Sequence, residues 1–538
     1  MTVPVIDLFA GPGGLGEGFS RARAAAFRIA ISIEKDGMAF ETLQLRAAHR
    51  ALAASPQVTR STWARWDSVI AESPWNVAFE MLRSSADPLI EAACEVARHE
   101  AVHLELGPDN RDVASAGIRA RLKPFMTRGR LPDNAVIIGG PPCQAYSIVG
   151  RSRNRGNKNY EAANDARHFL YREYLHVISE FRPAAFVMEN VKGILTSQVE
   201  GRQIFQSIID DLKRPDRACG EDAGLDYELF ALTPSTGGDL FELGPADFIV
   251  QAEAHGVPQA RHRVIICGVR RDVAQRAGHD LRLTREVPPT VGQVIDDLPP
   301  LRSQVSFRGR GMTWMECLDA PLMTTTLRAL RAHKDPVLAR VAKRMESGRE
   351  RARRQSDPGI GTDRDLVGVG AVPMPAAHAR WYRDRSLSLL ANHQARAHMP
   401  SDLVRYLFVA AFGQETGESP RLADFPLCLL PDHNNVDVLA PEDAIFKDRF
   451  RVQIRDRHSM TVTSHIAKDG HAFVHHDPVQ CRSMTVREAA RLQTFPDSYV
   501  FLGNRTSQYS QVGNAVPPYL AVQIAECIGK VLDQAGMA

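Results

Sequence analysis

The sequence predicts an α/β fold in which a doubly wound, mostly parallel sheet is joined to a second, smaller domain. Short apolar runs alternate with helical segments over residues 1–270, which is the pattern of a parallel sheet covered by helices on both faces. After Pro288 that alternation stops. A chain of 538 residues is also too long for a single hydrophobic core, so we expect at least two domains.

The first apolar run, Val3–Phe9, predicts a strand that breaks into a glycine-rich turn and then a helix from Leu15. Ile29–Glu34 predicts the second strand, and the stretch from Gly37 to His103, rich in Ala, Leu, Arg and Glu, predicts several helices. The next elements are expected in the order strand 135–138, helix Tyr171–Phe181, strand Ala184–Met188 and strand Arg263–Val269.

Prolines, arginines and irregular spacing dominate from Ser303 to Arg455, and we assign this stretch to the second domain. Regular structure returns near Arg482, where Thr485 and Glu488 form a capping-box pattern that predicts the start of a helix. The expected division is residues 1–300, with a helical insertion at about 50–110, then 301–470, then a return to the first domain over 471–538.

The composition, with 44% hydrophobic and 24% charged residues, is that of a soluble globular protein. The start of the chain does not have the pattern of a signal peptide, and no apolar run reaches the roughly 18 residues of a membrane span. The eight cysteines stand singly, without the paired spacing of a zinc site or a disulfide framework. We therefore expect a cytoplasmic protein with no membrane partner and no metal.

The positive charge is concentrated in one part of the chain. Residues 301–360 hold 13 Lys or Arg against 6 Asp or Glu, while the whole chain has a net charge of only +3. Such a basic block is typical of a site for a polyanion, and the solvated face of a helix is the alternative.

The turn after the first predicted strand, residues 11–16, reads GPGGLG and fits the pattern GxGxxG at the start of a helix. Glu34 follows 18 residues after Gly16, at the end of the second predicted strand, where an acid can bind the hydroxyls of a ribose. Because glycine lets the backbone approach a ligand closely, the loop suits NAD, FAD or S-adenosylmethionine. A plain tight turn is the alternative.

A single thiol, Cys143, follows Pro141 and Pro142 just after the predicted strand 135–138. Ligands of such sheets bind beyond the carboxyl ends of the strands, and two prolines restrict the backbone that presents this thiol. A thiol held in one place suits a nucleophile. Most lone cysteines are inert core residues, which is the alternative.

Two further groups are expected at the same edge of the sheet. Glu189 ends another predicted strand, and a buried carboxyl there can deliver a proton. Arg261 and Arg263 stand directly before an apolar strand and can clamp a phosphate and an electron-rich ring. A thiol, an acid, an arginine pair and a nucleoside-binding loop form a specific combination.

The motifs resemble, in order, those of the DNA (cytosine-5)-methyltransferases. The matching segments are DLFAGPGG at 7–14, IEKD at 33–36, GGPPCQAYS at 139–147, DARHFL at 165–170, ENVKGIL at 189–195, HGVPQARHRVIICGV at 255–269, REAARLQTFPD at 487–497 and QVGNAVPP at 511–518. The resemblance implies the Rossmann-like sheet of class I S-adenosylmethionine-dependent methyltransferases. It makes residues 1–300 and 471–538 the catalytic domain and residues 301–470 the target-recognition domain.

The resemblance also implies a role for each catalytic candidate. Cys143 would add to C6 of the target cytosine, and Glu189 would bind or protonate N3. Arg263 would hold the O2 edge of the base, and Arg261 a neighbouring phosphate. A paired base conceals C5 and C6, so the enzyme has to rotate the target nucleotide out of the duplex.

S-adenosyl-L-methionine is the implied methyl donor. The residues implied to bind it are Phe9, Gly11, Gly13, Gly14, Glu34, Asp112, Pro141, Leu170 and Asn514. Lys35 stands where many family members carry an aromatic residue against the adenine.

Double-stranded DNA is the implied partner, and the candidates for contacting it are Arg308, Arg310, Arg328, Asn392 and Arg396. Four histidines, His465, His471, His475 and His476, lie close together, and we expect structural or DNA-backbone contacts of them rather than a metal site. The resemblance further suggests a monomer near the nucleoid, in a restriction–modification or host-methylation system, with any cognate restriction endonuclease acting separately. Two alternatives stay open: a tRNA cytosine-5 methyltransferase and a catalytically inactive DNA-binding homologue.

Overall fold

The computed structural model describes residues 1–142, 170–199, 202–233, 243–278, 281–306, 311–361, 364–365, 374–383, 390–430 and 449–538. The chain forms two compact units, of which the first comprises Met1–Val287 and Ala515–Ala538 and the second Pro288–Asn514. The chain thus divides at residues 288 and 515, whereas the sequence placed the divisions near 300 and 470. The catalytic and target-recognition roles of the two units stay predictions.

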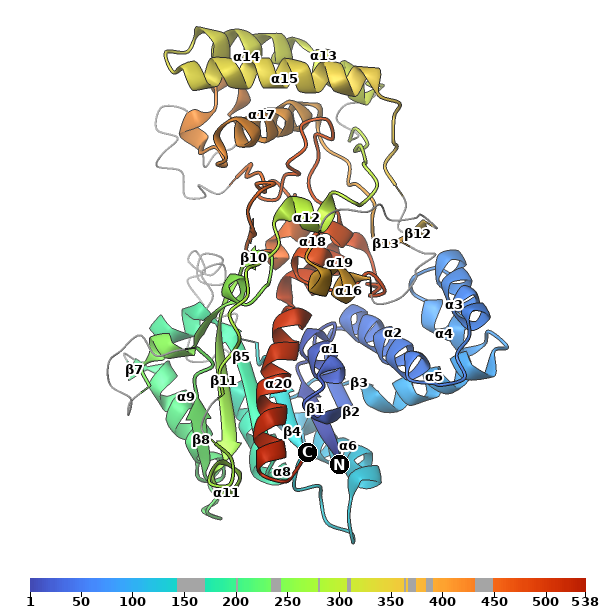
Figure 1. The fold of residues 1–538 in the computed structure, drawn as a ribbon, viewed down its shortest axis with the longest axis vertical. Helices are drawn as coiled ribbons and strands as arrows, with labels where there is room; N and C mark the ends of the chain where they lie inside the picture. Colours follow the sequence, from blue (N-terminus) through green and yellow to red (C-terminus); the bar gives the residue numbers. More distant parts are fainter. Residues whose placement is uncertain are drawn as a thin grey trace. The chain divides into compact units, whose positions relative to one another are not determined.

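A central sheet organises the first unit, with eight strands among the described residues (Figure 1). The strands are β1 (Thr2–Leu8), β2 (Ala26–Glu34), β3 (Ala101–His103), β4 (Val136–Gly139), β5 (Ala185–Val191), β8 (Tyr227–Phe230), β9 (Ile249–Gln251) and β11 (His262–Arg270). Their order is β3-β2-β1-β4-β5-β11-β8, with β9 also paired to β11. Strands β1 to β5 run parallel and β11 runs antiparallel to its neighbours. The predicted α/β class with a mostly parallel, Rossmann-like sheet is confirmed, because the chain order reverses between β1 and β4 as in doubly wound folds.

Helices cover both faces of this sheet because successive residues of a strand point to opposite faces. In β4, Val136 and Ile138 belong to the core beneath α1 (Gly14–Arg21) and α20 (Pro518–Gln534). Ile137 belongs to the core on the other face. That second core also receives side chains from α6 (Arg111–Leu122), α8 (Leu170–Phe181) and α9 (Ile204–Lys213).

The stretch predicted to be helical contains α2 (Gly37–Ala53), α3 (Arg60–Glu72), α4 (Ala78–Arg83) and α5 (Pro88–Glu100), of which α3, α4 and α5 lie within the predicted insertion at about 50–110. The helical prediction up to His103 is wrong in its last three residues, which form β3. The helical pattern continues into a stretch that instead pairs with β2, so a tertiary contact overrides the local pattern. The remaining short elements of this unit are α10 (Pro215–Ala218), α11 (Arg271–Ala274), β6 (Gln198–Val199), β7 (Arg202–Gln203) and β10 (Gln259–Ala260).

The second unit is mainly helical. Its helices are α12 (Val291–Ile295), α13 (Trp314–Asp319), α14 (Pro321–Ala332), α15 (Pro336–Arg354), α16 (Ala376–Tyr382), α17 (Pro400–Thr416), α18 (Val486–Leu492) and α19 (Arg505–Asn514), and its short strands are β12 (Arg364–Asp365), β13 (Leu390–Ala391) and β14 (Ser459–Met460). Helix α17 is buried along most of its length and packs against α13, α14 and α15. The predicted capping box is confirmed, because the backbone N–H of Glu488 donates to Thr485 Oγ1 and the N–H of Thr485 donates to Glu488 Oε2.

Across the described ranges, none of the helices is long and apolar enough to cross a membrane.

Candidate active site

The carboxyl ends of the parallel strands form one edge of the first unit's sheet. In the strand register Leu8 of β1 lies beside Gly139 of β4, which in turn lies beside Met188 of β5. Strand β11 runs the other way, and Arg263 at its start pairs with Val191 at the end of β5. The glycine-rich turn, Glu34, Glu189 and Arg263 therefore all lie at this edge.

The glycine-rich turn needs its glycines. Gly11 and Gly13 have positive φ angles of 58° and 96°, a region that favours glycine, and Phe9 is held at 54°. A Cβ on Gly14 would collide with the carbonyl oxygen of Val516, where the chain enters α20. A Cβ on Gly11 would meet nothing within 4 Å in the part of the chain that the structure describes, so the turn faces open space there.

The carboxylate of Glu34 is tied to the glycine-rich turn. Its Oε2 accepts a hydrogen bond of 2.7 Å from the N–H of Gly11, and its Oε1 accepts one of 2.7 Å from the N–H of Asp36. Burial raises the pKa of Glu34, while these backbone donors lower it. A carboxylate offers about four acceptor positions, so Glu34 keeps acceptor capacity for a hydroxyl of a ribose.

A second acid lies near Glu34, and the sequence reasoning missed it. The N–H of Leu104 donates to the carbonyl of Glu34 at 3.0 Å, and the next residue, Glu105, forms an ion pair with Lys35. The predicted adenine-binding acid, Asp112, is exposed in the first turn of α6. An acid two residues after β3 would have been the signal for Glu105, but that strand was predicted to be helical.

Glu189 and Arg263 form a buried ion pair, with Glu189 Oε1 3.0 Å from Arg263 Nε. The carboxylate also lies against the backbone of Gly140, because a Cβ there would be 3.0 Å from Glu189 Oε2. The side-chain amide of Asn190 donates to the carbonyl of Pro141 at 3.3 Å. Two consecutive residues of β5 thus contact the short segment that leads to the predicted nucleophile.

Arg261 adds a second buried guanidinium at this edge, with only 1% of the residue exposed. Burial lowers the pKa of Arg261 well below its ordinary value, the neighbouring charge of Arg263 lowers it further, and Glu189 raises it. Burial also lowers the pKa of Arg263, against the effect of Glu189. Two buried cations beside one carboxylate leave an excess of positive charge, which suits an anion or an electron-rich base edge.

Several of the predicted site residues lie outside the described residues or away from this edge of the sheet. Cys143, Arg308 and Arg310 lie outside the described residues. Leu170 begins α8 and is partly buried, while Asn514 is exposed at the end of α19 in the second unit.

Asn392 does not have the surroundings of a DNA-contacting residue. It is 1% exposed, and its side-chain amide donates to the carbonyl and accepts from the N–H of Phe501, both at 2.9 Å. Its amide group therefore fixes the backbone of the second unit. Arg396 lies over the ring of Tyr509 at 4.6 Å, and Arg328 is exposed on α14.

Two of the four histidines contact each other, and the other two have different surroundings. The rings of His475 and His476 stack at 4.5 Å, and His476 Nε2 lies 2.7 Å from Asp296 Oδ1. His471 contacts the hydroxyl of Tyr406, and His465 is exposed. Among the described residues no group of three or more His, Cys, Asp or Glu side chains could hold a metal ion.

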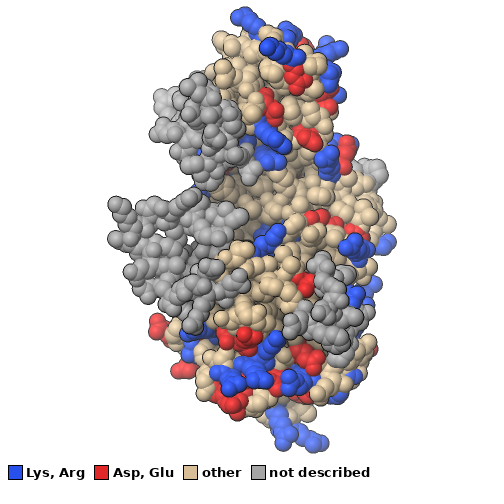
Figure 2. All heavy atoms as spheres, turned by 90° about the vertical axis from the view of Figure 1, so that its left-hand side faces the viewer, with Lys and Arg blue, Asp and Glu red and all other residues tan. Residues whose placement is uncertain are grey.

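Helices α14 and α15 lie within the basic block at 301–360, and Figure 2 shows exposed Lys and Arg at the top of the view with some acidic side chains among them. Part of this charge is neutralised. Arg340 and Arg344 are both paired with Glu415, and Arg353 with Asp319. The exposed cations of the two helices without an ion-pair partner among the described residues are Arg328, Lys343, Arg351 and Arg354.

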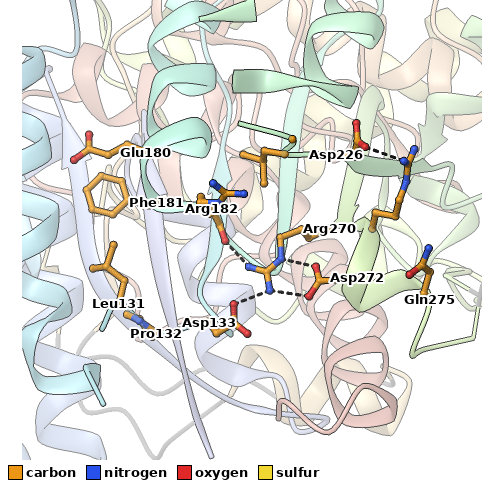
Figure 3. Close-up of a pocket in the computed structure, with 13 residues that line it drawn as sticks. Leu131, Pro132, Asp133, Glu180, Phe181, Arg182, Asp226, Arg270, Asp272 and Gln275 are labelled. Carbon is orange, nitrogen blue, oxygen red and sulfur yellow. Dashed lines mark hydrogen bonds and ion pairs between the residues drawn. The ribbon is translucent and has the colours of Figure 1, made fainter. Parts of the chain in front are cut away.

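A cavity of about 610 Å³ lies at the opposite edge of the sheet (Figure 3). It is lined by residues that precede β4 and β5 and by residues at the end of β11. Its central cation, Arg270, is paired with Asp133 and Asp272 and donates to the carbonyl of Arg182 (Figure 3). This cavity is distant from the strand ends that carry Glu189 and Glu34, so it is not the candidate active site.

The sheet order and the glycine-rich turn with its acid define the fold of class I methyltransferases. The family model described as C-5 cytosine-specific DNA methylase matches residues 118–220 and 426–530. The chain is 30% identical to the type II methyltransferase M.Bpa9945I of Bacillus paralicheniformis over 98% of this chain and 99% of that protein. It is 28% identical to the type II methyltransferase M.AgeI of Thalassovita gelatinovora, over 73% of this chain and 82% of that one.

A third relative is the DNA (cytosine-5-)-methyltransferase M.ApeKI of Aeropyrum pernix, which is 26% identical over 74% of this chain and 82% of the relative. The chain therefore belongs to the C-5 cytosine-specific DNA methylase family, and its enzyme class is DNA (cytosine-5-)-methyltransferase.

Proposed function

We propose that the protein transfers a methyl group from S-adenosyl-L-methionine to C5 of a cytosine within a specific double-stranded DNA sequence, through a transient bond between Cys143 and C6. The observation that carries the proposal is the Glu189–Arg263 ion pair beside Gly140, three residues before Cys143, at the edge that also holds the glycine-rich turn. In this proposal one bound base would contact the acid, the guanidinium and the thiol that follows this segment.

The residues at the edge fit the proposed cofactor, whose sulfonium supplies the methyl group. Glu34 keeps acceptor capacity for a ribose hydroxyl. The open backbone at Gly11 and the partly buried ring of Phe9 leave room for the methionine portion. Glu105 is a nearer candidate for the adenine amino group than Asp112, because it lies two residues after His103, which pairs with Glu34 in the sheet.

The proposed chemistry begins at the extruded cytosine. The Cys143 thiolate forms a bond to C6 while Glu189 delivers a proton to N3, so that the electron pair of the C5–C6 double bond becomes available at C5. C5 would then attack the methyl carbon of the cofactor, whose bond to the sulfonium sulfur breaks, so that S-adenosylhomocysteine leaves. A water-derived base would take the C5 proton, the thiolate would leave C6, and the N3 proton would return to Glu189, which restores the aromatic ring. Arg263 holds the O2 edge of the base during these steps, and Arg261 holds a phosphate.

The relatives with type II in their names support a role in a restriction–modification system, in which a cognate endonuclease acts separately. We propose that the protein works as a monomer on DNA in the cytoplasm, near the nucleoid. Arg328, Lys343, Arg351 and Arg354, which are exposed and have no ion-pair partner in the part of the chain that the structure describes, would contact the DNA backbone.

Covalent trapping tests the proposal. Duplex DNA with 5-fluorocytosine cannot lose a proton from C5, so the wild-type protein and S-adenosylmethionine should give an adduct that survives denaturing electrophoresis. Cys143→Ser should give no adduct while still binding S-adenosylhomocysteine. Absence of the wild-type adduct would disprove the covalent route. A parallel incubation with tRNA tests the alternative substrate, and labelling of tRNA alone would overturn the DNA assignment.

A further inference from the structure

Helix α1 starts directly at the glycine-rich turn, and its orientation therefore governs the cofactor site. Gly13 caps the helix without a side-chain hydrogen bond, and the N–H of Glu17 donates to the carbonyl of Gly13 at 2.9 Å. On one side α1 packs closely on α20, where Gly18 lies against Ala521 with no space for a Cβ.

An ion pair between Glu17 of α1 and Arg46 of α2 holds the helix on another side. The side chain of Glu17 is fully buried, and Arg46 of α2 binds both of its oxygens, with Nη2 2.5 Å from Oε1 and Nε 2.8 Å from Oε2. Arg21 adds a contact of 2.6 Å to Oε1. Burial favours the neutral acid, but the charges of Arg46 and Arg21 hold the pKa of Glu17 well below its ordinary value.

The contact continues into the helical insertion. Arg50, one turn after Arg46, lies 3.6 Å from Glu17 and forms an ion pair with Glu100 at the end of α5. The helices α2 and α5 pack against each other, and α5 leads directly into β3. The insertion thus connects the third strand of the sheet with the helix that follows the glycine-rich turn.

A buried ion pair is not an efficient way to stabilise a fold, since apolar residues of similar volume often do as well. What a two-pronged guanidinium–carboxylate pair does provide is a fixed orientation. We propose that Arg46 is a positioning residue for the cofactor: by holding Glu17, it fixes α1 and the glycine-rich turn in the conformation that admits S-adenosylmethionine. The inference rests on the proposed function, because it assumes that this turn binds the cofactor.

The test compares Arg46→Met with a matched control in the second unit, Arg482→Met. Arg482 is 1% exposed and binds both oxygens of Glu488, at 2.8 and 2.6 Å, so Arg482→Met removes a similarly buried ion pair from the second unit. Affinity for S-adenosylhomocysteine is measured by titration calorimetry, and KM and kcat by methyl transfer, at a temperature where melting curves show each variant folded.

We expect Arg46→Met to bind S-adenosylhomocysteine about tenfold more weakly, the scale of coupling within a buried network. Its KM for S-adenosylmethionine should rise, with kcat at saturation close to that of the wild type. Arg482→Met should lose stability but keep its cofactor affinity. Unchanged affinity in Arg46→Met, or an equal loss in the control, would overturn the proposal.

The double variant Glu17→Gln/Arg46→Met separates positioning from stability. It removes the buried carboxylate together with Arg46, while Arg21 is partly exposed and Arg50 keeps Glu100, so it should be more stable than Arg46→Met. Its affinity for S-adenosylhomocysteine should stay low, and recovery of affinity together with stability would show that the pair is only structural. Arg46→Lys, which keeps the charge but loses the fork, should bind with intermediate affinity. A wild-type protein that does not bind S-adenosylhomocysteine would refute the proposed function instead.

Discussion

The side chains of Glu189 and Arg263 meet across two antiparallel strands, with 3.0 Å between the carboxylate Oε1 and the guanidinium Nε. The strand register places Arg263 opposite Val191, two residues beyond Glu189. Both side chains are largely buried, and the carboxylate also rests on the backbone of Gly140. Packing on two sides fixes the direction of the acid, and orientation is what makes a proton donor effective.

Replacing Glu189 should slow methyl transfer without preventing the cofactor from binding. Glu189→Gln keeps the shape of the side chain but cannot deliver a proton in the same way, so we expect kcat to fall by roughly 10²-fold or more. Binding of S-adenosylhomocysteine should be unchanged. The matched control is Glu253→Gln, which removes a carboxylate 2.7 Å from His262 and should leave kcat near the wild-type value. A Glu189→Gln rate like that of the wild type would remove this residue from the mechanism.

The unpaired cations of α15 should contribute to DNA affinity without contributing to sequence preference. Neutralising Lys343, Arg351 and Arg354 together should weaken binding to all duplexes alike. The plot of log K against log salt concentration should become shallower by about 0.9 per lost phosphate contact. Fluorescence anisotropy at several salt concentrations measures both effects.

The control for the cation experiment comes from the same helices. Arg331 and Arg353 are paired with Glu346 and Asp319, so replacing these two arginines by glutamine should change the salt slope less. Equal slopes for the two sets of variants would contradict the role of the unpaired cations.

The second unit should lose stability in mild acid. Burial lowers the pKa of His393 from 6.5 to about 4. The ring contacts the carbonyl of Pro299 and the hydroxyl of Thr485, which suits a neutral imidazole. Burial lowers the pKa of His475 as well. These depressed values stabilise the folded state fully above pH 6.5, and that contribution is lost as the pH falls toward 4.

Urea denaturation at several values of pH between 7.5 and 4.5 measures this loss. The slope should reach about 1.4 kcal/mol per pH unit for each histidine at its steepest. His393→Gln keeps a donor and an acceptor but does not titrate, so its stability should depend less on pH. An identical pH dependence in this variant and the wild type would exclude His393 as a contributor.

The sequence predicts much of the first unit because its patterns are local. The apolar runs that form β1, β2, β4, β5 and β11 are interrupted by glycine, proline or charge at their ends. The capping box at Thr485 is equally local. The direction of β11 could not be predicted, because an apolar run has the same pattern in a parallel and in an antiparallel strand.

The features that escaped prediction depend on residues far apart in the chain. The pair of Glu17 and Arg46 spans 29 residues, and that of Asn392 and Phe501 spans 109. Asn392 has the chemistry of a base-reading residue, and only its burial shows that its amide serves the backbone. Ion pairing likewise divides the basic block into neutralised and available charges, which a count of Lys and Arg cannot do.

The chain leaves the first unit at residue 287 and re-enters it at residue 515. The two junctions differ, because Val287 is 86% exposed whereas Val516 is 6% exposed and its carbonyl oxygen abuts Gly14. If residues 288–514 are exchanged for the corresponding segment of a relative, the junction after Val287 should therefore tolerate a change of sequence. The junction before Ala515 should tolerate it much less. A hybrid enzyme joined upstream of Ala515 would keep the contact between Val516 and Gly14 beneath the glycine-rich turn. A junction a few residues later would replace the residues that make this contact.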